Sequence, residues 1–336
     1  MDYRFLGTTG VKVSPLCLGA MMFGGNGNPD HDDSIRIIHR ALDAGINFID
    51  TADVYSRGES ETIVGKALAD GKRDNVVLAT KAHGGMGDDV NEQGNSRRWI
   101  TKEVDNSLRR LGTDWIDLYQ IHRPDPTTDI DETLGVLTDL VRAGKIRYFG
   151  SSTFPAYQVV EAQWVAQSRG RERFVCEQPP YSLLVRGIEA DVLPVTQKYG
   201  MGVIPWSPLA GGWLTGRYRL GQDAPDSNRG RRADLSTPES QAKLEVVEKL
   251  AVLAEEAGVS LVDFSLAFVI RHPAITSAII GPRTMEQLES QINAPDVTLS
   301  TEVLDKIDEI VPPGTNVGGG TAWTTPALTD ASLRRR

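Results

Sequence analysis

The segment from Asn47 to Tyr55, with the sequence NFIDTADVY, combines residue types that suit acid–base chemistry. Phe48 and Ile49 form a short apolar run, which is typical of a buried strand, and Asp50 and Tyr55 follow it. These two residues therefore lie at the carboxyl-terminal end of the predicted strand. In a parallel α/β fold, ligands bind at the carboxyl-terminal ends of the strands. A tyrosine becomes a useful acid only if its pKa falls from about 10. A nearby cation would lower it, so the rest of the chain must supply one.

Two further predicted strands lead to residues that complete this chemistry, Lys81 and His122. The Lys81 ammonium would favour the phenolate form of Tyr55, and Asp50 could hold Lys81 in an ion pair. His122 could donate to, or orient, a substrate oxygen, which would place a proton donor at a carbonyl group. Each residue alone also has an ordinary structural role, as a cap, an ion pair or a core histidine. Their grouping on three successive strand ends favours catalysis.

The elements that position these residues alternate regularly along the chain. A hairpin is predicted over 3–14. Apolar runs predict strands at 16–20, 48–49, 75–81, 115–121, 146–149, 173–176, 201–205 and 275–280. Amphipathic segments predict helices at 30–43, 60–68, 100–111, 134–142, 156–167, 187–197, 240–257, 262–271, 285–292 and 301–310, with Ser60 as an N-cap of the second. Polar loops are expected at 84–98 and 208–236.

This alternation predicts an α/β fold, a (β/α)8 TIM barrel with an N-terminal hairpin and extra C-terminal helices. We expect one domain over residues 1–336, with an irregular tail over 312–336. A doubly wound open sheet is the alternative, although no GxGxxG follows the first predicted strand.

Composition narrows the class of protein further. The chain has 336 residues, of which 40% are hydrophobic and 24% charged, as in ordinary globular domains. A net charge of −9 argues against a general affinity for nucleic acid or anionic membranes. The two cysteines, Cys17 and Cys176, lie in apolar runs and form no zinc-ligand pattern, which favours a reduced, cytoplasmic setting. The first residues lack the apolar core of a signal peptide, and no apolar run is long enough to span a bilayer.

The motifs DTADVY, ATK and LYQIHRPDP, in this order, resemble the aldo-keto reductase superfamily. Within this superfamily, the chain resembles the bacterial branch near potassium-channel β subunits, glyceraldehyde-phosphate reductases and aryl-alcohol dehydrogenases. The resemblance covers about residues 5–310 and implies a barrel that binds NAD(P)H across the strand C-termini without a Rossmann motif. It implies a catalytic tetrad, with Tyr55 as general acid in reduction, made of Asp50, Tyr55, Lys81 and His122.

The same resemblance implies where the cofactor would bind. Thr153 replaces the family's usual Asn, and Gln291 stands where many relatives carry Asn. An aromatic ring at Trp206 could stack on the nicotinamide, and Arg283 could pair with a 2′-phosphate, which favours NADPH over NADH. The implied cofactor residues are Met21, Ser152, Gln178, Trp206, Ser207, Leu209, Gly211, Arg217, Gly281, Arg283, Gln287 and Gln291.

The expected substrate pocket includes Met22, Phe23 and, from the tail, Trp323. A small-molecule aldehyde, ketone or keto-sugar would fit this chemistry, and the oligomeric state stays open. Two other functions remain possible. The chain could be a nucleotide-sensing subunit of the channel-β type with slow chemistry. It could also be a barrel isomerase or aldolase that uses Lys81 as a Schiff base, although an ion pair with Asp50 disfavours a neutral amine.

Overall fold

The computed structural model describes residues 1–223, 234–319 and 331–333. Within them, eight parallel strands form one sheet in the order β10-β3-β4-β5-β6-β7-β8-β9. Further backbone hydrogen bonds join the β9 and β10 segments, among them those from Thr276 to Val203 (2.8 Å) and from Ile279 to Pro205 (2.9 Å). They bring the two ends of the sheet together, so the strands form a barrel and the open-sheet alternative is wrong. The strands are β3 (Leu16–Gly19), β4 (Phe48–Asp50), β5 (Val77–Ala82), β6 (Ile116–Ile121), β7 (Ile146–Ser152), β8 (Cys176–Gln178), β9 (Gly202–Val203) and β10 (Ala278–Ile280).

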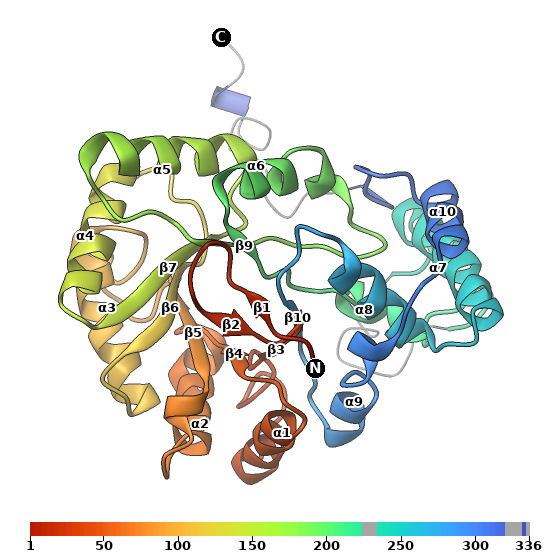
Figure 1. Cartoon of the computed structure of the whole chain (residues 1–336), viewed down its shortest axis with the longest axis horizontal. Coiled ribbons are helices and arrows are strands. Elements are labelled where there is room, and N and C mark those ends of the chain that lie inside the picture. Colours follow the sequence, from red (N-terminus) through yellow and green to blue (C-terminus); the bar gives the residue numbers. More distant parts are fainter. Residues whose placement is uncertain (224–233, 320–330, 334–336) are drawn as a thin grey trace.

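Helices surround the barrel and connect its strands (Figure 1). α10 follows the last strand and contacts α7, which confirms an extra C-terminal helix. The helices are α1 (His31–Asp43), α2 (Glu59–Ala67), α3 (Arg97–Leu111), α4 (Ile130–Arg142), α5 (Ala156–Arg169), α6 (Val192–Tyr199), α7 (Pro238–Glu256), α8 (Leu261–Arg271), α9 (Met285–Glu289) and α10 (Thr301–Ile310). Short 3₁₀ helices include η1 (Tyr55–Gly58), η2 (Arg73–Asn75), η3 (Gly187–Ala190) and η4 (Ala210–Thr215).

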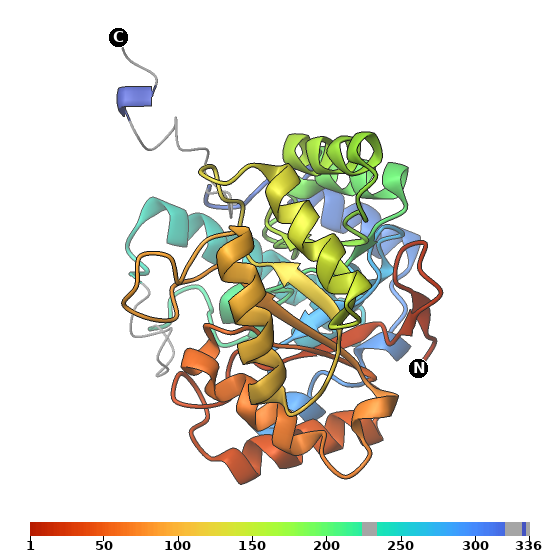
Figure 2. The same cartoon turned by 90° about the vertical axis from the view of Figure 1, so that its left-hand side faces the viewer.

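The N-terminal hairpin covers one end of the barrel. Its strands, β1 (Arg4–Phe5) and β2 (Lys12–Val13), pair antiparallel as predicted. Leu6 and Val13 are buried in one cluster with the barrel residues Phe48 and Leu118, so the hairpin closes the amino-terminal end of the barrel. Figures 1 and 2 show the hairpin at this end, and the long loop before α3 lies at the opposite end.

Successive strand residues point to opposite sides of the barrel wall. In β4, Phe48 joins the interior cluster and Ile49 joins the larger cluster between the strands and the helices. In β6, Leu118 and Tyr119 divide in the same way. This alternation decides which polar residue, further along each strand, faces the barrel interior.

Several sequence-based boundaries differ from the structure: the segment predicted as a helix at 187–197 is η3 followed by α6, and two further differences concern a cap and a strand end. Ser60 does not cap α2, because the N-cap is Gly58, with φ +89°. The buried Ser60 hydroxyl instead donates to the Ala20 carbonyl (2.7 Å). The sixth barrel strand is Cys176–Gln178 and not 173–176. Glu177 is charged, yet it is fully buried and forms the middle of this strand.

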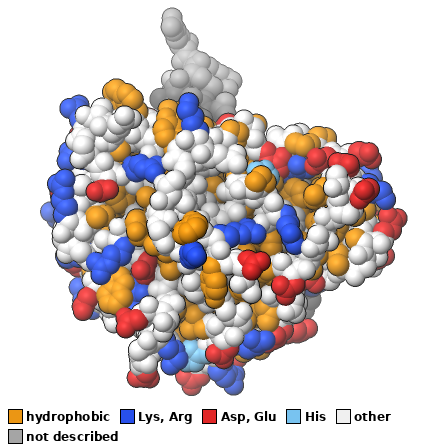
Figure 3. All heavy atoms as spheres, viewed as in Figure 1, with side chains coloured by type: hydrophobic (Ala, Val, Ile, Leu, Met, Phe, Trp, Pro, Cys, Tyr) orange, Lys and Arg blue, Asp and Glu red, His pale blue; other side chains and the backbone are white. Residues whose placement is uncertain are grey.

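Acidic and basic side chains are intermixed on the face shown in Figure 3. Among the described residues, no helix combines the length and apolar character needed to cross a bilayer. No group of His, Cys, Asp or Glu side chains suited to a metal ion occurs in the same part of the chain.

Candidate active site

The candidate tetrad lies at the carboxyl-terminal end of the barrel interior. Asp50 follows Phe48 by two residues, and Lys81 follows Ala79 by two residues. Because Phe48 and Ala79 belong to the interior cluster, the period of two directs both polar side chains inward. The same spacing relates Leu118 to Gln120 and His122, and Cys176 to Gln178.

Lys81 is the centre of a buried hydrogen-bonded group. Its side chain is fully buried, and Nζ forms an ion pair with Asp50 Oδ1. Nζ also donates to the Thr51 carbonyl (2.8 Å) and to Tyr55 Oη (3.3 Å). The structure therefore brings the expected cation, acid and phenol into direct contact.

Two amides hold the other oxygen of Asp50. Gln120 and Gln178 each donate from Nε2 to Asp50 Oδ2 at 2.9 Å, and Gln178 also donates to Gln120 Oε1 (3.0 Å). We did not identify Gln120 from the sequence. Its position two residues before His122 on one strand was the available signal, since both side chains then face the same way.

The electrostatics of Tyr55 differ in one respect from the prediction. Burial raises the pKa of Tyr55 above its ordinary value of 10, and the nearby Lys81 ammonium opposes this rise without overcoming it. Burial also lowers the pKa of Lys81, but Asp50 and Tyr55 outweigh burial and raise it overall. Lys81 thus stays protonated at neutral pH, which does not suit a Schiff-base lysine.

His122 is uncharged at neutral pH. Burial, followed by the positive charges of Lys81 and Arg123, holds its pKa well below 6.5. Its ring meets that of Tyr55 edge to face, with 5.6 Å between centroids. A neutral imidazole next to the phenol can donate one hydrogen bond to a substrate oxygen.

A left-handed turn follows Tyr55 directly. Ser56, Arg57 and Gly58 have φ of +48°, +54° and +89°, a conformation that non-glycine residues rarely adopt. Ser56 Oγ donates to the Phe23 carbonyl (3.2 Å) and accepts from the Asn26 amide (3.1 Å). These contacts join the turn that carries Tyr55 to the loop after β3.

The residues expected to contact a nicotinamide lie next to this group. Ser152 is buried, and its hydroxyl donates to the Gln178 carbonyl (3.0 Å). Thr153 has φ +62°, and its amide donates to the same carbonyl (3.1 Å). Trp206 is half-buried, and its buried Nε1 has no hydrogen-bond partner within residues 1–223, 234–319 and 331–333. The side-chain nitrogen of Gln178 already donates to Asp50 and Gln120, so its side-chain oxygen Oε1 is the atom that could accept a hydrogen bond from a ligand.

The loop after β9 supplies the expected phosphate-binding residues. Ser207, Gly211 and Gly212 have positive φ, and Leu209 begins the turn. The space where a Cβ of Gly212 would project is open. Arg217 is exposed, and its only hydrogen bond to a described residue is to Thr215 Oγ1 (3.2 Å). The loop can therefore receive an anion.

The loop after β10 supplies the expected adenosine site. Gly281 is exposed, with open space where a Cβ would be. Gln287 Oε1 accepts from the backbone amide of Arg283 (2.8 Å), while the Arg283 side chain is half-buried. Gln291 is buried, and its Oε1 has no partner among the described residues. An unpaired buried amide oxygen fits a ligand that carries an amino group.

The three pocket predictions, and the prediction that Met21 contacts the cofactor, have different outcomes. Met21 is exposed and Met22 is half-buried, so both can contact a ligand. Phe23 is fully buried in the core, so the prediction that it lines the mouth is wrong. The Phe23 amide donates to the Ala20 carbonyl (3.0 Å), which closes a tight turn after β3. Phe23 points into the core from this turn. Trp323 lies outside the described residues.

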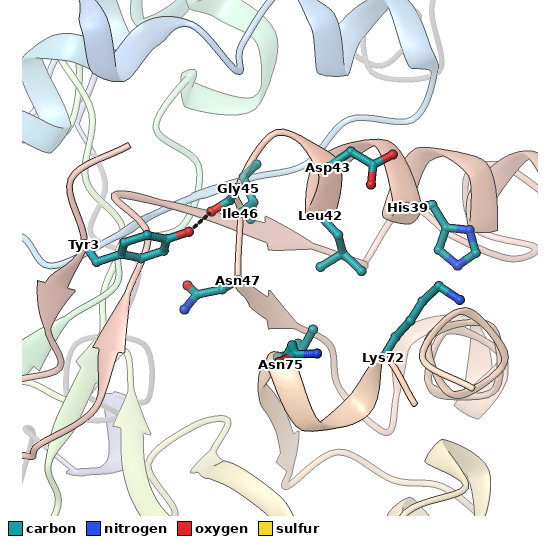
Figure 4. A pocket seen from close by; sticks show the side chains of 10 residues that line it. Tyr3, His39, Leu42, Asp43, Gly45, Ile46, Asn47, Lys72 and Asn75 are labelled. Carbon is teal, nitrogen blue, oxygen red and sulfur yellow. Dashed lines mark hydrogen bonds between the residues drawn. The ribbon is translucent and has the colours of Figure 1, made fainter. Parts of the chain in front are cut away.

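A separate cavity of about 320 Å³ opens near the amino-terminal end of the strands (Figure 4). Three of its polar side chains already have partners: Tyr3 donates to the Gly45 carbonyl (3.0 Å), His39 contacts the Ala67 carbonyl (2.8 Å), and Asn47 donates to the Lys12 carbonyl (3.0 Å). The cavity lies at the end of the barrel opposite to Asp50, Tyr55 and Lys81, so we do not assign the chemistry to it.

Comparison with known proteins agrees with this geometry. The family model described as Aldo/keto reductase family matches residues 15–312. The chain belongs to the aldo/keto reductase family. Members of this family generally use nicotinamide cofactors and act on small-molecule carbonyl compounds, and the protein is an oxidoreductase.

Individual relatives of this aldo/keto reductase extend over almost the whole chain. One is the Uncharacterized oxidoreductase YrpG of Bacillus subtilis, which is 41% identical over 96% of this chain and 100% of its own. Another is a Putative voltage-gated potassium channel subunit beta of Schizosaccharomyces pombe, 36% identical over 93% of both chains. A third is the Versiconal hemiacetal acetate reductase of Aspergillus parasiticus, 32% identical over 92% of this chain and 96% of its own.

Proposed function

We propose that the protein is an NADPH-dependent reductase that converts an aldehyde, ketone or keto-sugar to an alcohol. The observation that carries the proposal is the 3.3 Å contact between the Lys81 ammonium and the Tyr55 hydroxyl, within a buried group that includes Asp50. This arrangement keeps a cation beside a phenol, as a proton donor at a carbonyl requires.

The residues near the tetrad fit a dinucleotide. Trp206, Ser152 and Gln178 would hold the nicotinamide end, the loop from Ser207 to Arg217 the pyrophosphate, and Arg283 with Gln291 the adenosine end. The unpaired Gln291 Oε1 and the open space beside Gly281 support this assignment. When bound, the nicotinamide supplies the hydride for the reduction.

The chain itself supplies the proton and the orientation of the substrate. Tyr55 would donate its proton to the substrate oxygen, and the neutral His122 would hydrogen-bond the same oxygen. Lys81 would stabilise the phenolate that remains, and Asp50, held by Gln120 and Gln178, would keep Lys81 in place. Because burial raises the pKa of Tyr55, Lys81 is needed to offset that rise when the proton leaves.

Oxidation of NADPH against a panel of aldehydes, ketones and keto-sugars tests the reaction, with Tyr55→Phe as the variant. We expect the loss of turnover to be about 10²- to 10⁴-fold, since this is the usual contribution of general acid catalysis. The affinity of this variant for NADPH, measured by calorimetry, should be unchanged. Tyr157→Phe, at an exposed tyrosine on α5, is the matched control. Full activity of Tyr55→Phe would remove Tyr55 from the mechanism.

Cofactor preference is tested at Arg283. Arg283→Gln should weaken NADPH binding by about 10-fold or more, because a charge-assisted contact to phosphate is lost. NADH binding should change little. Equal losses for both nucleotides would contradict the assignment of Arg283 to the 2′-phosphate.

The relatives named as channel subunits support a second candidate, a nucleotide-sensing subunit. Tight NADPH binding with no turnover on the panel, together with a stable protein partner, would favour it. The contact between Lys81 and Tyr55 favours catalysis, since sensing alone needs no proton donor.

A further inference from the structure

Arg123 follows His122 and lies at the edge of the candidate active site. Its Nη1 donates to the His122 carbonyl (2.5 Å), to Thr153 Oγ1 (3.3 Å) and to Ser152 Oγ (3.4 Å). Its guanidinium carbon is 6.0 Å from the centre of the Trp206 ring. The side chain therefore lies among the residues that we assign to the nicotinamide end of the cofactor.

The charge of Arg123 is not neutralised within the described chain. All the oxygens that it contacts are uncharged, and it makes no ion pair there, whereas most half-buried arginines of the barrel do, such as Arg73 with Asp117. Nε and Nη2 donate no hydrogen bond to a described residue, and neither atom is a buried group without a partner. One edge of the guanidinium fork is thus accessible and unused.

Glu177 is the nearby acid whose charge affects Arg123, but it does not form an ion pair with Arg123. Glu177 is fully buried, and its oxygens accept from Ser151 Oγ and from the Phe154 amide (3.1 Å). Burial raises the pKa of Glu177 to about 7, so it is only partly ionised at neutral pH. The positive charge of Arg123 remains in excess at this edge of the site.

The backbone of Arg123 is held from the loop before α3. Asn95 is buried and donates from Nδ2 to the Arg123 carbonyl (3.0 Å). The Asn95 amide in turn donates to Asp125 Oδ2 (3.0 Å). Arg123 is therefore presented from a fixed backbone position, as a specific binding group requires.

We propose that Arg123 binds an anionic group, a carboxylate or a phosphate, on the carbonyl substrate. The inference rests on the proposed reductase function and adds a substrate class to it. A planar guanidinium with a free edge matches the two oxygens of a carboxylate or phosphate. A neutral carboxamide would accept a hydrogen bond but would leave the charge uncompensated. Bound in this way, the anion anchors a substrate whose carbonyl oxygen reaches Tyr55 and His122.

The test compares three aldehydes of similar shape: 4-carboxybenzaldehyde, 4-formylphenyl phosphate and the uncharged methyl 4-formylbenzoate. Wild-type protein should show a lower KM for at least one of the two anionic aldehydes than for the ester. Arg123→Gln should raise the KM for that anionic aldehyde by about 10- to 100-fold, because this is the range for a lost hydrogen bond to a charged group. The KM for the ester should change less than about twofold. The anion that shows the larger change identifies the group bound.

A binding measurement separates this role from catalysis. Calorimetry of the same aldehydes with the NADP⁺-loaded protein, which cannot reduce them, should show the same loss of affinity in Arg123→Gln. Arg123→Lys should retain part of the preference, because it keeps the charge without the planar fork. Arg169→Gln, at an exposed arginine at the end of α5, is the charge-matched control. It should change neither the KM nor the calorimetric affinity for the anionic aldehydes.

Two outcomes would overturn the inference. One is equal KM values for the anionic and ester aldehydes in the wild type. The other is an equal rise in KM for all three aldehydes in Arg123→Gln. That result would mean that Arg123 acts on the cofactor or on the backbone of residues 152–153. In both cases Tyr55-dependent turnover of the ester would leave the reductase proposal standing. Absence of turnover with every aldehyde would count against the reductase proposal, and the calorimetric comparison would still decide whether Arg123 binds anions.

Discussion

The ammonium nitrogen of Lys81 lies 3.3 Å from the hydroxyl oxygen of Tyr55, and its other partners are Asp50 and the Thr51 carbonyl. Lys81 is thus an ion-pair partner and a neighbour of the phenol at once. Substitutions at Lys81 should therefore affect both stability and proton transfer, and the two effects can be separated.

Lys81→Met should lower turnover at least 100-fold, because the phenolate loses its cation. It should also destabilise the fold by about 3–5 kcal/mol, since Asp50 is left as an unpaired buried charge. The double variant Asp50→Asn/Lys81→Met should recover much of the stability but none of the activity. Urea unfolding and NADPH oxidation measure the two quantities. Recovery of turnover in the double variant would contradict the role of Lys81.

Gln120 should prove necessary for the position of Asp50, although the sequence did not indicate it. Gln120→Leu should cost about 1–3 kcal/mol, because Asp50 Oδ2 loses one of its two amide donors. Gln120→Glu should impair turnover at pH 7 and recover toward lower pH, where the new carboxyl group is neutral. A pH–rate profile measures this, and a pH-independent loss in Gln120→Glu would contradict the explanation.

Glu177 should make stability fall as pH rises. Burial raises its pKa from 4.5 to about 7, so the folded protein binds one more proton than the unfolded chain between these values. Over that range the free energy of unfolding should fall by about 3 kcal/mol. Glu177→Gln should remove this loss and be the more stable protein above pH 7. Urea unfolding at pH 5 and 8.5 measures the difference, with the exposed Glu161→Gln on α5 as control.

Asp125 should have the opposite dependence. Burial alone would raise its pKa, but hydrogen bonds from Thr127 and Thr128 outweigh burial and lower it from 3.8 to about 2. Because solvent screens this partly exposed carboxylate, its contribution should be about 1 kcal/mol, present above pH 4 and lost as pH falls through 2. Asp125→Asn should therefore be less stable than wild type at pH 7 and equal to it near pH 2. Thermal unfolding across this range is the measurement, and a constant difference would contradict it.

Much of the site follows from strand periodicity in the sequence. Phe48 and Asp50, and Ala79 and Lys81, are two residues apart, so each polar side chain must share a face with its apolar neighbour. The regular alternation of strands and helices then predicted that these faces meet inside one barrel, and the structure confirms that fold.

Other features depended on contacts between distant segments, which no local pattern encodes. The clamp of Gln120 and Gln178 on Asp50 joins three strands, so it exists only once the barrel has closed. The sign of the change in the pKa of Tyr55 depends on how far burial outweighs Lys81, and burial is a property of the packed molecule. For the same reason the sequence did not show that Phe23 is buried or that Arg123 forms no ion pair with a described residue. Residue types and spacing determined which groups face the site; tertiary packing decided their distances, their solvent exposure and thus their charges.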